Sequence, residues 1–174
     1  MMFHRPGWIM KGQRGFTLIE VIVALAITGL ISVGATTATV QVLSQSSSDS
    51  NYTTASRHTM NAIYWVSRDA QMSQTVEPGG PSGFPLTLSW VEWDNSEHQV
   101  IYSIEGDKLK RSYSINGGGT AQSVVARYIN SVSGNTTCEF AGGVLTVKVT
   151  ATVGDGSHAL SVAKVREITP RPGL

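Results

Sequence analysis

The sequence predicts an α+β protein: a long N-terminal helix, hydrophobic in its first half and amphipathic in its second, packs on a C-terminal antiparallel β-sheet. Two observations carry this prediction. The run from Phe16 to Leu43 is apolar and holds a single charged residue, Glu20. From Phe84 onward the apolar residues recur every second position, which is the spacing of half-buried strands. The chain has 174 residues, a length that suits one domain plus an anchor.

The apolar run is long enough to cross a membrane, since a span needs roughly 20 mostly apolar residues. Lys11 and Arg14 stand directly before it, and the next cation is Arg57. The positive-inside rule therefore predicts a single-pass membrane protein with its N-terminus in the cytoplasm and its C-terminus outside.

The single carboxylate in this run needs an explanation, because a charge in the bilayer costs on the order of 2.5–3.5 kcal/mol. A free amine would be the nearest partner for Glu20 if the chain were cut between Gly15 and Phe16. A secretory signal peptide is cut after its apolar region. A cut at Gly15 comes before that region, so the helix would stay on the product.

The residues around this bond carry a family resemblance. Gly15-Phe16-Thr17-Leu18-Ile19-Glu20, preceded by the basic residues Lys11 and Arg14, resembles the cleavage and methylation motif of type IV prepilins and of type II secretion pseudopilins. The resemblance runs from Lys11 to about Val33. It implies that a prepilin peptidase cuts between Gly15 and Phe16 and then methylates the new N-terminus of Phe16.

The same resemblance implies a pilin-like fold and a structural subunit of a type IV pilus-like filament or a type II secretion pseudopilus. The implied partners are other pilin or pseudopilin subunits, the prepilin peptidase, an assembly platform membrane protein and the membrane. The implied location is first the membrane and then a cell-surface or periplasmic filament. A membrane-anchored binding or adhesion domain that never polymerises is the alternative, and leader removal would discriminate the two. Pilus, secretion pseudopilus and DNA-uptake filament stay open.

These expectations divide the chain into five segments. They are a leader at 1–15, a membrane and filament-core half of the helix at 16–43, an amphipathic half at 44–76, an antiparallel sheet at 84–169 and a tail at 170–174.

The amphipathic half predicts which residues meet the sheet. Those expected to face it, from their spacing of three and four, are Met60, Ile63, Val66, Ser67 and Ala70. Those expected elsewhere on the surface are Arg57, Arg68 and Asp69. A cluster of proline and glycine at 78–83 is expected to stop the helix. Gly29, Gly34 and the threonines after them make a weak section, because glycine costs about 1 kcal/mol relative to alanine in a helix.

Composition and motifs predict no catalytic activity, cofactor or metal site. The sequence has no H-E-x-x-H, no G-x-S-x-G and no Walker loop. Any S-adenosylmethionine would belong to the modifying enzyme. The segments 94–97 and 155–157 have acidic residues that suit calcium, but turn chemistry explains them better. Trp65, Trp90 and Trp93 are expected to pack in the core rather than to form a binding surface.

The charge balance predicts no nucleic-acid partner. The chain has 13 Lys and Arg against 12 Asp and Glu, and removal of residues 1–15 takes away three cations and no carboxylate, which leaves a net charge of −2. A nucleic-acid footprint needs a clustered basic face.

Cys138 is the only cysteine, so no intrachain disulfide can form. Many major pilins clamp their C-terminal loop with a disulfide. Its absence favours a pseudopilin or a minor subunit. Cys138 is expected to be buried, with an intermolecular bridge as the alternative.

Overall fold

The computed structural model describes residues 15–156 and 159–172. It confirms the α+β architecture: one long helix, α1 (Leu18–Met72), and a domain of antiparallel strands. Its contacts divide the chain into two compact units, residues 1–45 and 46–174, and α1 contributes to both. We describe each unit by itself.

The described part of the first unit is helical from Leu18 onward, and its side chains are exposed. The helix continues through Gly29 and Gly34, where the sequence predicted weakness. Five hydroxyls in this region donate to the carbonyl oxygen four residues earlier, at 2.7–2.9 Å: Thr28, Ser32, Thr36, Thr37 and Thr39. Each hydroxyl thus has a partner within the helix, so the apolar surface presents no unsatisfied polar group there.

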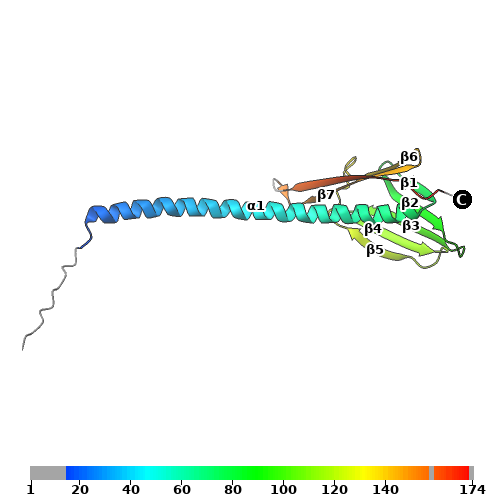
Figure 1. The fold of residues 1–174 in the computed structure, drawn as a ribbon, viewed down its shortest axis with the longest axis horizontal. Coiled ribbons are helices and arrows are strands. Elements are labelled where there is room, and N and C mark those ends of the chain that lie inside the picture. Colours follow the sequence, from blue (N-terminus) through cyan, green and yellow to red (C-terminus); the bar gives the residue numbers. More distant parts are fainter. Residues whose placement is uncertain (1–14, 157–158, 173–174) are drawn as a thin grey trace, which may run out of the picture. The chain divides into compact units, whose positions relative to one another are not determined.

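The second unit contains the end of α1 and eight strands in two sheets (Figure 1). The strands are β1 (Thr75–Gly79), β2 (Gly83–Val91), β3 (Glu97–Glu105), β4 (Lys108–Ile115), β5 (Ala121–Ala126), β6 (Thr137–Ala141), β7 (Val144–Val153) and β8 (Leu160–Ile168). Five of them form a meander in the order β1-β2-β3-β4-β5, and the other three form a sheet in the order β6-β7-β8.

The sheet domain differs from its prediction in two respects. The sequence predicted one sheet from residue 84, whereas the structure has two, and β1 begins at Thr75. The helix also ends before the proline and glycine cluster: Ser73 donates its N–H to the carbonyls of Asp69 and Ala70, which closes the last turn. Pro78 fits within β1 because β1 is an edge strand, where a missing N–H is tolerated.

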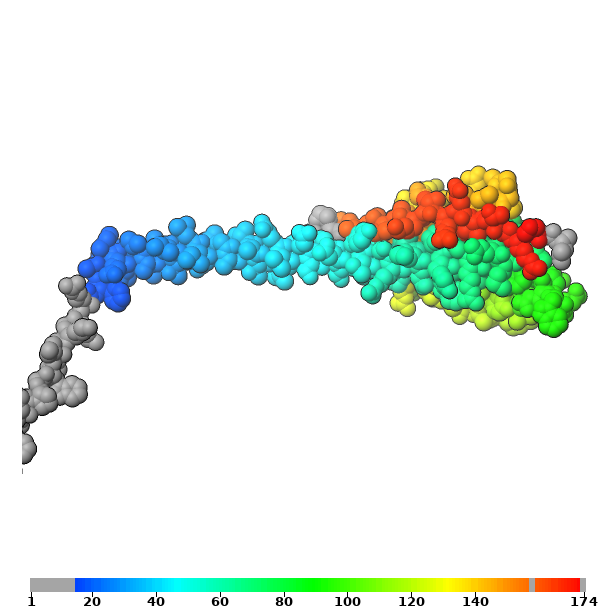
Figure 2. Space-filling model, viewed as in Figure 1, coloured from blue at the N-terminus to red at the C-terminus, as the bar shows by residue number. Residues whose placement is uncertain are grey.

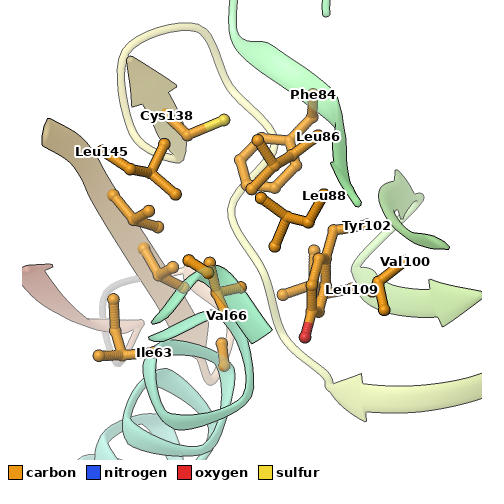
Figure 3. Packing of buried hydrophobic residues seen from close by; sticks show 14 of the residues in the cluster. Ile63, Val66, Phe84, Leu86, Leu88, Val100, Tyr102, Leu109, Cys138 and Leu145 are labelled. Carbon is orange, nitrogen blue, oxygen red and sulfur yellow. The ribbon is translucent and has the colours of Figure 1, made fainter. Parts of the chain in front are cut away.

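The core lies where α1 meets both sheets. Figure 3 shows Val66 of the helix between Leu145 of β7 on one side and the β2 residues Leu86 and Leu88 on the other, and Ile63 of the same helix belongs to the same cluster. All of these side chains are buried. The apolar contacts of one helix therefore hold the two sheets together.

Two predictions about the helix surface were wrong. Met60 was expected to face the sheet, but it is 60% exposed. Asp69 was expected on the surface, but it is only 2% exposed. Asp69 accepts hydrogen bonds from Arg111 of β4 and from the hydroxyl of Tyr102 of β3. A buried carboxylate is tolerated when it is paired and hydrogen-bonded in this way.

The three tryptophans do not share one environment. Trp90 is buried and stacks on His98, and Trp65 packs at the edge of the core. Trp93 is 94% exposed at the tip of the β2–β3 hairpin, so its predicted place in the core was wrong. Period-two patterning did not locate Trp93 because the hairpin turns immediately after Val91.

Cys138 is buried, as predicted, at the contact between the two sheets. Its N–H donates to the carbonyl of Ser82 at 2.9 Å, and its thiol lies 2.7 Å from the carbonyl of Gly83. Burial raises the pKa of the Cys138 thiol to about 12. The thiol therefore stays protonated and acts as a small packing group rather than as a nucleophile.

Candidate functional site: the N-terminal processing segment

The bond between Gly15 and Phe16 lies outside the helix. Residues 15–17 have no regular secondary structure, and α1 begins at Leu18. The side chain of Phe16 is 82% exposed. An accessible, non-helical backbone is what a protease needs in order to bind a substrate in extended form.

Among the described residues, no neighbour requires glycine at position 15. A Cβ atom added at Gly15 would meet nothing within 4 Å. The described structure therefore gives no intrachain reason for glycine at this position. Close approach by another molecule is one reason for which a backbone position needs glycine.

Thr17 begins the helix, and the sequence analysis did not identify its role. Its hydroxyl oxygen accepts a hydrogen bond from the N–H of Glu20 at 3.4 Å, and its carbonyl accepts from the N–H groups of Glu20 and Val21. Thr17 is thus the N-cap, and Glu20 holds the third helical position. Thr-x-x-Glu is the pattern of a capping box, which was visible in the sequence.

Glu20 is the acidic residue of the first helical turn. The helix dipole favours a carboxylate there by typically 0.3–1 kcal/mol. That gain is smaller than the cost of a charge within a bilayer. Among the described residues Glu20 has no ion-pair partner.

The basic residues Lys11 and Arg14, predicted to flank the site, lie outside the described residues. The structure therefore describes the site from Gly15 onward.

The apolar surface that follows Glu20 is uncovered. α1 is the one helix in the described structure that is long and apolar enough to cross a membrane, and its most apolar window has no buried residue. The stretch from Leu18 to Leu43 is helical, and at ~1.5 Å per residue it exceeds the ~30 Å of a bilayer core. A Cβ atom added at Gly29 or Gly34 would meet nothing within 4 Å, so the helix surface at these two glycines is uncovered in the described structure. Such small residues allow another helix to approach closely.

No group of three or more possible metal ligands occurs among the described residues. In one of the two acidic loops, Asp94 accepts a hydrogen bond from the N–H of Ser96 at 3.0 Å, which shapes a turn. In the other, Ser157 lies outside the described residues.

An N-terminal helix with an uncovered apolar surface and a capped start is consistent with a single-pass membrane anchor on an α+β protein. Residues 10–36 match the family model of the prokaryotic N-terminal methylation motif, which is the signature of type IV prepilins and pseudopilins. The chain thus carries the N-terminal signature of type IV pilin- and pseudopilin-like precursors over residues 10–36. No curated protein and no solved structure matches it.

Proposed function

We propose that this protein is a structural subunit, a minor pilin or a pseudopilin, of a type IV pilus-like filament or a type II secretion pseudopilus. One observation carries the proposal: the exposed Gly15–Phe16 bond immediately precedes a helix whose apolar surface has no cover within the described chain. That surface must be covered by lipid or by other helices, because water is unfavourable for so much apolar area.

In this proposal the precursor inserts with its N-terminus in the cytoplasm, where Lys11 and Arg14 remain. A prepilin peptidase removes residues 1–15 by hydrolysis of the Gly15–Phe16 amide and then methylates the amine of Phe16. The methylated amine keeps its positive charge. Residues 16–43 first span the membrane and later form part of a filament core.

Glu20 pairs with the Phe16 ammonium of a neighbouring subunit during assembly. If α1 extends back to Phe16 once the leader is removed, the two residues lie about 6 Å apart along the axis of one helix, at ~1.5 Å per residue. Each charge alone is costly in an apolar setting, whereas a close pair is tolerated. The contact would align an incoming subunit with one already in the filament, on the assembly platform membrane protein.

The outer domain gives no support to an enzymatic role. The described residues contain no group of three or more possible metal ligands, and burial raises the pKa of the Cys138 thiol. The lack of an intrachain disulfide favours a pseudopilin or a minor subunit, as in the sequence analysis.

Intact-mass measurement of the membrane-extracted protein tests this proposal. Cells with an active prepilin peptidase should yield a chain that lacks residues 1–15 and carries one methyl group, and cells without the peptidase should yield the full chain. A full-length chain in both strains would contradict the proposal. It would favour the alternative of an anchored domain that never polymerises.

A further inference from the structure

A groove runs along the second unit between α1 and β8. The two elements lie side by side on the face shown in Figure 2, and the hydroxyl of Thr59 donates to the carbonyl of Val162. The groove has a volume of about 570 Å³ and is lined by Met60, Ile63, Tyr64, Ser67, Arg68, Gln71, Lys164, Val165 and Arg166. We name it the α1–β8 groove.

The floor of the groove is apolar and open. Met60, Tyr64 and Val165 each expose more than half of their side-chain surface. The hydroxyl of Ser67 is buried in this region and has no hydrogen-bond partner. Exposed apolar residues gathered beside an unsatisfied buried donor indicate a surface that another molecule covers.

The rim of the groove is basic. Arg68 comes from α1, and Lys164 and Arg166 come from β8, whereas no carboxylate lines the groove. Its occupant should therefore be apolar at the centre and acidic around it.

One segment of this same chain combines an exposed apolar side chain with acidic residues around it. The tip of the β2–β3 hairpin, residues 92–97, holds the exposed ring of Trp93 among the carboxylates of Glu92, Asp94 and Glu97. We name it the Trp93 tip. It belongs to the green part of the second unit in Figure 2.

Hydrogen bonds within the Trp93 tip hold its backbone in one conformation before it contacts another molecule. Glu92 and Ser96 are joined by a backbone hydrogen bond of 3.0 Å, Asn95 donates its N–H to Glu92, and Asp94 accepts from Ser96. A preformed loop loses little conformational entropy on binding, and tryptophan is enriched among the residues that contribute most to binding at protein interfaces.

We propose that the Trp93 tip of one copy of this protein docks in the α1–β8 groove of a second copy. The ring of Trp93 covers the apolar floor, and the acidic residues around it face Arg68, Lys164 and Arg166. Tip and groove are different surfaces of the same chain, so the contact is heterologous and repeats from copy to copy. The inference rests on the proposed filament role and adds the outer-domain contact that accompanies it.

A photo-crosslinking experiment on the full-length protein in its native membrane tests the docking. Tyr64→p-azidophenylalanine places a reactive azide in the groove in a side chain of similar shape and leaves Trp93 intact. After illumination we expect covalent dimers and larger oligomers, with the crosslink mapped by mass spectrometry to residues 92–97. Tyr52→p-azidophenylalanine is the matched control, because Tyr52 is an exposed tyrosine on the same helix outside the groove. Its crosslinks should not map to the Trp93 tip.

Charge exchange adds a second measurement. Trp93→Ala and, separately, Lys164→Glu should each lower the yield of this crosslink at least tenfold, and Glu97→Lys should restore it in the Lys164→Glu background. Crosslinks that map elsewhere, or that are unchanged by Trp93→Ala, overturn the docking contact.

Leader removal and the amount of the chain in sheared filaments, measured in the same cells, separate this inference from the proposed function. Chain in filaments without the crosslink overturns the docking contact alone. A crosslink in membranes without chain in filaments supports the contact and overturns the filament role. If neither the crosslink nor the chain in filaments is found, both the docking contact and the filament role are overturned.

Discussion

Asp69 of α1 and Arg111 of β4 form a buried ion pair 42 residues apart in the sequence. The carboxylate of Asp69 accepts from Nε of Arg111 at 2.7 Å and from Nη2 at 3.2 Å. Burial alone would lower the pKa of Arg111, but its hydrogen bonds and charge contact with Asp69 outweigh this and raise it. The guanidinium also lies over the rings of Trp65 and Tyr113. The pair therefore joins the C-terminal end of α1 to the five-stranded sheet.

Asp69→Ala should destabilise the outer domain by about 3 kcal/mol, because it leaves the guanidinium of Arg111 partly buried without its partner. The free energy of unfolding of the detergent-solubilised chain measures the change. Glu105→Ala is the control, since it breaks the exposed pair with Lys110 and should cost less than about 1 kcal/mol. Equal losses for the two variants would contradict a structural role for the buried pair.

Gly83→Ala should disrupt the contact between the two sheets. Gly83 has φ of +80°, and a Cβ atom there would lie 1.9 Å from the carbonyl oxygen of Cys138. We expect reduced stability and a Cys138 thiol that reacts readily with maleimide, whereas the wild-type thiol is protected. Gly119→Ala is the control, because its Cβ would meet nothing within 4 Å and its φ lies outside the left-handed region. Protection of Cys138 from maleimide in both variants would show that the contact between the two sheets does not need the close approach of Gly83 to the backbone of Cys138.

The outer domain should lose some stability as the pH falls below about 6.5. His58 accepts the N–H of Arg127 through Nδ1, and burial, followed by the charge of Arg127, lowers the pKa of His58 from its ordinary value of 6.5. The unfolded chain therefore takes up a proton first, so stability is complete above that value and declines as the pH falls towards the folded pKa. Thermal unfolding measured from pH 8 to pH 5 should show this decline. If the stability of His58→Gln declines by the same amount between pH 8 and pH 5, the pH dependence comes from a group other than His58.

Gly15→Val should block removal of residues 1–15 without affecting the outer domain, because Gly15 has no neighbour within 4 Å in the described structure. Gly15→Ala should be processed slowly. An immunoblot that resolves the precursor from the mature chain measures the effect, and Gly29→Ala, which lies beyond the bond, serves as the control. Normal processing of Gly15→Val would refute a peptidase contact at Gly15.

The sequence predicted the elements whose pattern is local. The apolar run and the motif around Gly15 were visible, because each depends on residues close together in the chain. The T-x-x-E capping pattern was equally visible and was overlooked.

Other features depend on distant partners, and no local pattern reveals them. Asp69 is buried only because Arg111 and Tyr102 reach it from β3 and β4. The contact between the two sheets joins Cys138 of β6 to the carbonyls of Ser82 and Gly83, which lie more than 50 residues earlier in the chain. Trp93 was assigned to the core by residue type, although its hairpin carries it into solvent.

The central claim is that Glu20 acts in assembly and not in folding of the outer domain. Every strand begins at or after Thr75, and in the described structure Glu20 belongs to the other compact unit. Glu20→Gln removes the charge and keeps the shape, so membrane insertion, leader removal and the outer domain should be preserved.

The most direct test expresses Glu20→Gln, verifies by intact mass that residues 1–15 are removed, and then measures the chain in sheared filament fractions against wild type. The proposed pairing with the Phe16 ammonium predicts a cleaved chain that stays in the membrane, with incorporation reduced at least tenfold. Incorporation of the cleaved variant at the wild-type level would contradict it.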